Sequence, residues 1–356
     1  NMTDQTPEQE MASRISSMQH KLSNLQSSVR LSDLRDGVED LNAKVNELSP
    51  RIKNLRVKGY VFGKGFEARA AGLSSQWREI RQNVTQEISR QCPNLEAELS
   101  PLESRFSQIR HRSGTPAAIK SSVDRLEKDL EFFESKVRRV ESSIRGMYDS
   151  FSKQVDVFTR ELEQIKWALQ QSAEACFQLL PTEGLVMAVK ARCSFDEKMG
   201  KDDPEGILYL TDQRIIFEQK QEVATKNFLF IATEKEKIQK QLLAEPVGMV
   251  DEAVPSKKGL FGHQDHLAVT FKREASVRAV WLHLDGQDCN WWQGLIGQAR
   301  SGDFDDERVV AIDKKAEEKV RSAPSNCPNC GAPVTQTVLR GMDSIRCEYC
   351  QYIIRL

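Results

Sequence analysis

The feature that most constrains this chain is a long series of apolar residues spaced alternately three and four positions apart across its first 180 residues. This spacing places apolar side chains along one side of an α-helix, as in a coiled-coil seam. The three series begin at Met11, Phe66 and Ile119 and end at Leu48, Ile109 and Leu169. We therefore expect a helical rod whose apolar stripes are buried against neighbouring helices, against a second copy of the chain, or both.

Several residues predict where these helices begin and end. The spacing slips near Ser32, which predicts a break, and Pro50 predicts the end of the first helical region because proline disfavours helix in the residue before it. Ser100–Glu103 has the pattern of a capping box, so the second helix is predicted to restart at Pro101. The third is predicted to run unbroken over Pro116–Leu180, a length of roughly 95 Å.

The connection between the first two helical regions is basic and aromatic, with no acidic residue between Glu47 and Glu67. Its candidate contact residues for a polyanion are Arg51, Lys53, Arg56, Lys58, Tyr60, Phe62 and Lys64. Cationic and aromatic side chains together suit an anionic membrane surface or single-stranded nucleic acid. The same composition also fits a glycine-rich connector whose aromatic rings pack against the end of the helices.

After Pro181 the apolar spacing changes from helical to alternating, which predicts β-strands. The predicted strands cover residues 185–189, 207–210, 214–217, 227–231, 266–271 and 277–282. The charged segment Thr233–Glu245 is predicted to be a helical insertion, and Asp288 to cap a closing helix over residues 288–296. Strands followed by one helix predict a small twisted sheet or barrel closed at one end.

The run Gly206–Phe217, with the sequence G-I-L-Y-L-T-D-Q-R-I-I-F, resembles the signature hairpin of GRAM domains, which have the PH-like fold. The resemblance extends over about residues 183–300 and includes the C-terminal helix with its tryptophans. It implies a PH-like β-barrel with a C-terminal helix, serving as a non-catalytic module that binds phosphoinositides, other anionic lipids or proteins. Between residues 181 and 301, 18 acidic residues face 16 Lys and Arg, so Lys257 and Lys258 are the candidate lipid contacts there.

Four cysteines near the C-terminus have the spacing of a metal site. Cys327 and Cys330 form one C-x-x-C pair, and Cys347 and Cys350 form a second pair after 16 intervening residues. This spacing is typical of a tetrahedral four-thiolate zinc site, in which protein ligands fill every position and the metal is structural. Such a site replaces the core that a segment of about 30 residues cannot build.

Residues 327–356 resemble a zinc ribbon, a class whose members bind proteins or nucleic acids. Segments 334–339 and 344–346 are predicted to form a hairpin around the turn Arg340-Gly341. At most four basic residues accompany this ribbon, which leaves the choice between a protein and a nucleic acid open at this module. For the chain as a whole, whose net charge is −1, a protein partner is expected and nucleic acid is not.

These patterns predict a multidomain α + β protein with a helical coiled-coil rod (1–180), a GRAM/PH-like domain (181–301), a charged linker (302–326) and a zinc ribbon (327–356). The polar N-terminal segment and the lack of a long apolar stretch predict a soluble cytoplasmic protein. No grouping of acids, bases and nucleophiles typical of an active site is evident, so the chain is predicted not to be an enzyme.

The first functional hypothesis is a scaffold that oligomerises through the rod and docks on a membrane surface, or on a membrane-associated protein, through its β module. The alternatives are a pure protein–protein adaptor without lipid binding and a nucleic-acid-associated zinc-ribbon protein. The adaptor hypothesis predicts that the basic loop packs internally. The nucleic-acid hypothesis predicts binding that weakens steeply with salt.

Overall fold

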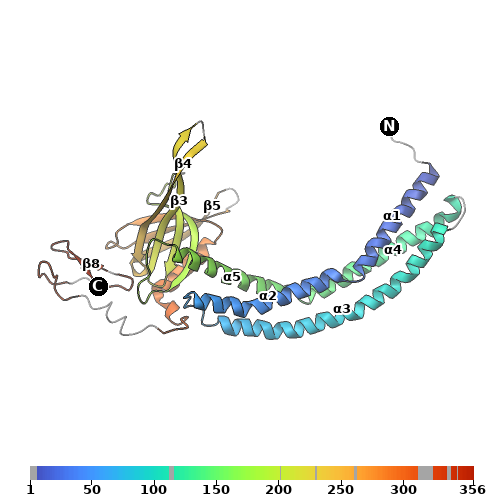
Figure 1. Cartoon of the computed structure of the whole chain (residues 1–356), viewed down its shortest axis with the longest axis horizontal. Coiled ribbons are helices and arrows are strands. Elements are labelled where there is room, and N and C mark those ends of the chain that lie inside the picture. Colours follow the sequence, from blue (N-terminus) through green and yellow to red (C-terminus); the bar gives the residue numbers. More distant parts are fainter. Residues whose placement is uncertain are drawn as a thin grey trace. The chain divides into compact units, whose positions relative to one another are not determined.

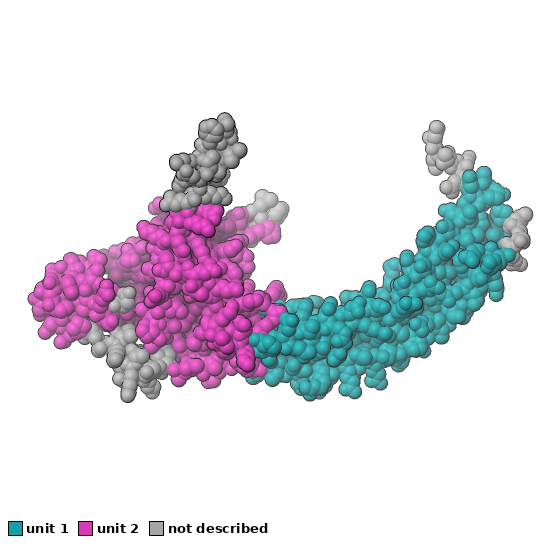
Figure 2. Space-filling model, in the orientation of Figure 1, with its two compact units in different colours: residues 1–50, 68–159 teal, residues 51–67, 160–356 magenta. Residues whose placement is uncertain are grey.

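The computed structural model describes residues 6–111, 116–200, 202–228, 231–259, 263–311, 324–334, 338–342 and 344–356. Residues 223–228 and 231–236 are described by their backbone only. The chain divides into two compact units, residues 1–50 with 68–159 and residues 51–67 with 160–356 (Figure 2). Each unit is considered by itself below.

The described part of the chain forms five long helices before the first strand: α1 (Pro7–Ser28), α2 (Ser32–Val57), α3 (Phe66–His111), α4 (Pro116–Gly146) and α5 (Asp149–Ala173) (Figure 1). Their apolar stripes are buried, as the spacing predicts. Within the first unit α1 packs against α4, and Trp77 of α3 stacks on Phe151 of α5 with ring centroids 5.4 Å apart. None of the described helices has both the length and the apolar character needed to cross a membrane.

Two of these helical stretches are interrupted. The break predicted near Ser32 is confirmed, since α1 ends at Ser28 and Leu31 has a φ of 52°. The prediction of one helix over Pro116–Leu180 is wrong, because the chain leaves the helix between Gly146 and Asp149 and α5 ends at Ala173. A Cβ at Gly37 would lie 3.4 Å from the hydroxyl of Tyr148, so the second interruption packs beside the start of α2.

The prolines do not end the helices. Helix α2 continues through Pro50 to Val57, and α3 continues through Pro93 and Pro101, so the predicted end at Pro50 and the predicted restart at Pro101 are wrong. A proline inside a helix costs about 3 kcal/mol. The stripes on either side of these positions are fully buried, and their packing offsets that cost. The predicted turn after His111 lies outside the described residues.

The second unit contains a seven-stranded antiparallel sheet in the order β4-β3-β2-β1-β7-β6-β5. Its strands are β1 (Leu185–Ser194), β2 (Glu205–Thr211), β3 (Arg214–Phe228), β4 (Ile231–Pro246), β5 (Val250–Lys258), β6 (Gln264–Phe271) and β7 (Ala279–Leu284). Helix α6 (Cys289–Ser301) follows β7 and contributes the fully buried Trp292. Strands β4 and β5 are the two edges, so the described strands form an open sheet and not the closed barrel that was predicted.

Strand β4 forms where a helical insertion was predicted. Thr233–Glu245 is not a helical insertion, because β4 pairs with β3 in a long hairpin. The segment 227–231, predicted as a strand of its own, falls where β3 ends and β4 begins. The run of charged residues in the sequence of this segment hides the apolar–polar alternation by which strands are recognised, and backbone pairing to β3 decides the structure. Asp288 caps α6 as predicted, accepting hydrogen bonds from the amides of Asn290 and Trp291.

The burial of the helical stripe predicts a specific loss of stability. Leu130 of α4 is 0% exposed, whereas Phe132, two residues later, is 68% exposed. Leu130→Ala is expected to lower the free energy of unfolding by about 2–5 kcal/mol, because it leaves a cavity in the stripe. Phe132→Ala is the matched control and should change it little. Urea unfolding followed by circular dichroism measures both, and an equal effect of the two substitutions would contradict the assignment of the buried face.

Candidate metal centre

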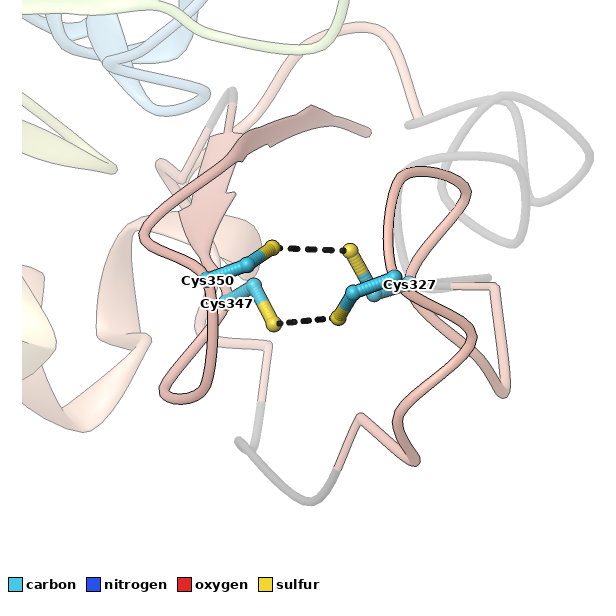
Figure 3. A group of neighbouring side chains, drawn as sticks. Cys327, Cys347 and Cys350 are labelled. Atoms are coloured by element: carbon cyan, nitrogen blue, oxygen red, sulfur yellow. Dashed lines mark hydrogen bonds between the residues drawn. The ribbon is translucent and has the colours of Figure 1, made fainter.

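The four predicted ligand cysteines come together near the C-terminus. Their Sγ atoms all lie within 4.8 Å of one another. The Sγ atoms of Cys327 and Cys350 are 3.7 Å apart, and those of Cys330 and Cys347 are 3.6 Å apart (Figure 3). Zinc–sulfur bonds of about 2.3 Å in a tetrahedron require sulfur separations of about 3.8 Å, whereas a disulfide needs about 2.05 Å. The donor set therefore fits one structural zinc ion.

Two equivalent backbone turns position the thiols. The amide of Gly331 donates to the carbonyl of Cys327 (2.8 Å), and the amide of Gln351 donates to that of Cys347 (2.9 Å). The residue after each second cysteine has positive φ, 73° at Gly331 and 61° at Gln351. Each C-x-x-C pair is thus the same tight knuckle, with both thiols directed toward the other pair (Figure 3).

Hydrogen bonds also stabilise the deprotonated form of one thiol, that of Cys350. The side-chain amide of Asn329 donates to Cys350 Sγ (3.5 Å), and the backbone amide of Tyr352 does so as well. These donors lower the pKa of Cys350 to about 6. The thiolate is the form that binds metal, so these donors favour the ligating state of Cys350. At the neighbouring Cys330 the amide of Ala332 lowers the pKa, but hydrogen bonds with the other thiols outweigh this effect and raise the pKa to about 12.

The strands around the cysteines differ from the predicted hairpin. Strand β8 (Ser344–Arg346) pairs with β9 (Ile353–Arg355), which follows the second C-x-x-C pair. The prediction paired residues 344–346 with 334–339, of which 335–337 lie outside the described residues. Gly341 does lie in a turn, with a φ of 91°. We call residues 324–356 the cysteine module.

Asp212, in the turn between β2 and β3, joins the cysteine module to the sheet. Its side chain is 1% exposed. Oδ1 accepts from the amide of Gly184 (2.8 Å), while Oδ2 accepts from Arg308 (2.5 Å) and Arg340 (2.6 Å). Burial raises the pKa of Asp212, against the lowering effect of these hydrogen bonds and of the two arginine charges. The carboxylate and Arg308 are buried, whereas the side chain of Arg340 is 23% exposed; we call these three residues the Asp212 triad.

The turn that carries Arg340 sits closely on the sheet. A Cβ at Gly341 would lie 2.4 Å from the carbonyl oxygen of Gln213, so only glycine allows this approach. Arg340 also holds Asp305 at 2.7 Å. A Cβ at Gly248 would be 3.4 Å from the side chain of Leu339. The cysteine module is therefore seated on the β2–β3 turn.

The predicted basic loop lies inside the second unit. Phe62 is 1% exposed and packs against Phe304, with centroids 5.4 Å apart, and beneath the guanidinium of Arg308 at 5.1 Å. The amide of Val309 donates to the carbonyl of Val61 (2.8 Å). Tyr60 is also buried. The prediction that Tyr60 and Phe62 contact a membrane or polyanion is wrong, because both rings are covered by the protein.

The remaining predicted contacts divide into engaged and exposed residues. Arg56 donates to the carbonyls of Tyr60, Phe62 and Gly63 and binds Glu67, so it holds the loop together and is not an outward contact. Arg51 pairs with Glu163. Lys257 pairs with Asp265 and Asp288. The exposed candidates are Lys53, Lys58, Lys64 and Lys258.

Sequence reasoning missed the Asp212 triad. Asp212 falls within the GRAM-like run, where it was assigned to turn formation, and Arg308 and Arg340 belong to segments without a periodic pattern. Arg308 is 96 residues and Arg340 is 128 residues away from Asp212 along the chain. The one local signal in the sequence is the pair Arg340-Gly341 in a predicted turn. A glycine there allows a positive φ and a close approach of this turn to another part of the backbone.

Comparisons with known proteins give a limited picture. No protein-family model matches the chain, and no curated protein matches it. Among solved structures it is similar to the N-terminal PH domain of Vps36, with 15% identity and a TM-score of 0.24 over 35% of this chain and 84% of that one. It is also similar to a DUF1696 family protein with a pleckstrin-homology domain from Shewanella loihica, with 14% identity and a TM-score of 0.23 over 38% and 92%.

A longer match covers the DH/PH domains of p115-RhoGEF, with 13% identity and a TM-score of 0.23 over 84% of this chain and 95% of that one. Because the matched proteins include guanine nucleotide exchange factors, the prediction that this chain is not an enzyme is withdrawn. TM-scores this low carry no argument for an activity. The first two of these structures are named for PH or pleckstrin-homology domains, and the GRAM/PH-like assignment of this chain stays a prediction.

The thiol geometry predicts the metal content. The purified chain should carry one zinc ion, measured by inductively coupled plasma mass spectrometry, and Cys347→Ser should lose it because three ligands no longer complete the tetrahedron. Cys176→Ser, at an exposed cysteine outside the cluster, is the control and should retain zinc. Loss of zinc in the control, or full retention in Cys347→Ser, would contradict the site.

The Asp212 triad predicts a second loss of stability. Asp212→Asn keeps the shape of the side chain but leaves Arg308 and Arg340 without their shared charge partner, so it should lower the free energy of unfolding of the second unit by about 3–5 kcal/mol. Asp251→Asn, at an exposed position of β5, is the control. Chemical denaturation measures the free energy of unfolding of both variants. If Asp212→Asn lowers it by less than about 1 kcal/mol, the triad contributes no more than an exposed ion pair and the prediction is wrong.

Proposed function

We propose that this chain is a protein-binding adaptor whose cysteine module presents the partner-binding surface. The observation that carries the proposal is an exposed group of large side chains in this module: Tyr349, Tyr352 and Ile353 are 69%, 46% and 56% exposed. They fall within five consecutive residues at the second knuckle and the start of β9. Apolar and aromatic side chains held outward by a rigid module are typical of protein interaction sites. We call them the Tyr349 patch.

The docking of the module favours this role. Arg340 and Gly341 are occupied with the β2–β3 turn, so the Tyr349 patch is presented from a fixed base and loses little freedom when a partner binds. A zinc ion, when bound, supplies structural rigidity to the two knuckles. The PH-like sheet and the cysteine module would then act as one binding body.

A membrane contact has less support. The membrane hypothesis rested on the basic loop and on Lys257 and Lys258. The loop aromatics are buried, Arg56 binds loop carbonyls, and Lys257 is neutralised by two carboxylates. Internal packing of the loop is what the pure adaptor hypothesis predicted.

A nucleic-acid contact is disfavoured for a related reason. Base stacking needs aromatic rings beside a run of cationic side chains. The rings of Tyr60 and Phe62 are covered, and the tyrosines of the Tyr349 patch have Glu348 among their neighbours in sequence. Self-association through the helices, a cytoplasmic location and the domain boundaries at residues 180, 301 and 326 remain predictions.

The test is a comparison of partner capture by matched variants of the full chain. The patch variant is Tyr349→Ser with Tyr352→Ser, and the control variant is Lys53→Gln with Lys58→Gln and Lys64→Gln. Captured proteins are quantified by mass spectrometry after chemical cross-linking in nuclease-treated extract. We expect a protein retained by the wild type and the control to be reduced about tenfold or more by the patch variant, as for loss of interface anchors. Zinc content verifies that the patch variant keeps its fold.

Two results would contradict the proposal. One is capture that is unaffected by the patch substitutions, which would place the partner surface elsewhere. The other is flotation with anionic but not neutral vesicles that is lost in the lysine control, which would restore the membrane hypothesis. Capture that occurs in a parallel extract without nuclease and is absent from the nuclease-treated extract would point instead to nucleic acid.

A further inference from the structure

A groove of about 900 Å³ lies on the first unit between α2 and α3, which run side by side in opposite directions (Figure 1). Glu39, Asn42 and Asn46 of α2 line one wall, and side chains of α3 between Ser74 and Ser89 line the other. At 1.5 Å per residue, this stretch of α3 is about 22 Å long. The volume is in the range of ligand sites in proteins. None of the lining residues belongs to the metal centre or the Tyr349 patch.

The bottom of the groove is held in place by contacts between helices. Trp77 of α3 is 3% exposed, stacks on Phe151 of α5, and donates from Nε1 to Asn42 Oδ1 (3.1 Å). Because the indole occupies the oxygen of Asn42, the NH₂ group of that side chain is left as a donor. Arg81 of α3 pairs with Glu39 of α2 (2.8 Å), which links the two walls. A ligand would therefore meet a preformed surface, which lowers the free-energy cost of binding.

Side-chain amides are the main hydrogen-bonding groups of the walls. Asn42 and Asn46 come from α2, and Gln82 and Gln86 come from α3. Within the part of the chain that the structure describes, Asn46, Gln82 and Gln86 make no side-chain hydrogen bond. A side-chain amide has an acceptor oxygen and a donor NH₂ group, the same chemistry as a peptide group. Such a side chain can therefore bind the N–H and the C=O of an extended chain together.

The charges of the groove leave one cation unmatched. Its charged lining residues are Glu39, Arg78 and Arg81. Glu39 pairs with Arg81, whereas Arg78 has no ion pair with any described residue. A carboxylate on a ligand would give Arg78 a charge-assisted hydrogen-bond partner.

The polar lining also selects the conformation of the ligand. An amphipathic helix binds in an apolar groove, and an added strand needs a free sheet edge, whereas these walls are polar and helical. A proline-rich segment docks on aromatic rings, but the ring of Trp77 is covered. An extended polar segment, bound through its main chain, is the ligand that fits this lining.

We infer that this groove binds an extended, acidic peptide segment of a partner protein. The side-chain amides of Asn42, Asn46, Gln82 and Gln86 bind its main chain, and Arg78 binds a carboxylate. An extended chain advances about 3.4 Å per residue, so six or seven residues span about 22 Å. The groove lies in the first unit and does not rest on the function proposed for the cysteine module, so either proposal can fail alone.

The experiment selects a phage-displayed library of random seven-residue peptides on the immobilised full chain and measures the enriched peptides by fluorescence polarisation. The test variant is Gln82→Ala with Gln86→Ala. The control variant is Gln76→Ala with Asn83→Ala, which removes two exposed amides of the same helix that do not line the groove. Alanine preserves the helix in both variants. Loss of two hydrogen-bonding side chains should weaken binding by about tenfold in the test variant alone.

The charge of the ligand is tested with a third variant, Arg78→Gln. We expect the enriched peptides to be rich in Asp and Glu and to bind Arg78→Gln more weakly than the wild type, with a difference that shrinks as salt is added. Enriched peptides that lack acidic residues and bind this variant as well as the wild type would overturn the inference.

Three further outcomes would also overturn it. One is a library that yields no enriched peptide on the wild type. Another is equal binding of the enriched peptides to the test and control variants. The last is a dimer of the wild type, seen by light scattering, that dissociates in the test variant, because the groove would then hold a second copy of the chain. If circular dichroism shows that the double variant loses helix, Gln86→Ala alone takes its place.

Discussion

The structure of the second unit depends on one buried carboxylate. Asp212 accepts from the amide of Gly184 and from two arginines that reach it from segments far along the chain, Arg308 and Arg340. A charge in this environment is tolerated only while its partners stay in place. The triad therefore fixes the β2–β3 turn, the segment after α6 and the cysteine module together. The triad also positions the loop of residues 58–65, because Phe62 of this loop packs beneath the guanidinium of Arg308.

The metal centre and the triad support each other through a short stretch of chain. The two knuckles flank, in sequence, the segment that carries Arg340 and Gly341, so a metal bound by the four cysteines would reduce the conformational freedom of the turn that docks on Gln213. In return, the docked turn restrains the chain between the two cysteine pairs. The exposed tyrosines of the module then project from a base that is held at both ends, which is the physical ground for regarding the module as a binding surface.

Sequence patterns predicted the features that depend on spacing and missed those that depend on tertiary contact. The three–four spacing of apolar residues in α1 to α5 is typical of packed helices. The spacing of the two C-x-x-C pairs is typical of a four-thiolate metal site. Pro50 and Pro101 were misjudged because packing of a buried stripe outweighs one lost hydrogen bond. Strand β4 was misjudged because its charged residues obscure alternation, although pairing with β3 holds it. The basic loop suggested a polyanion contact, but only the fold reveals that Phe304 and Arg308 cover its aromatic side chains.

The most direct test of this account is hydrogen exchange of the full chain before and after zinc is removed with a chelator. If the cysteine module is built into the seven-stranded sheet, metal removal should accelerate exchange in the β2–β3 turn at Asp212–Arg214 and at Gly184, and should leave α1 and α4 unchanged. If only the module's own amides exchange faster while the β2–β3 turn stays protected, the module is an independent appendage and the central claim is wrong.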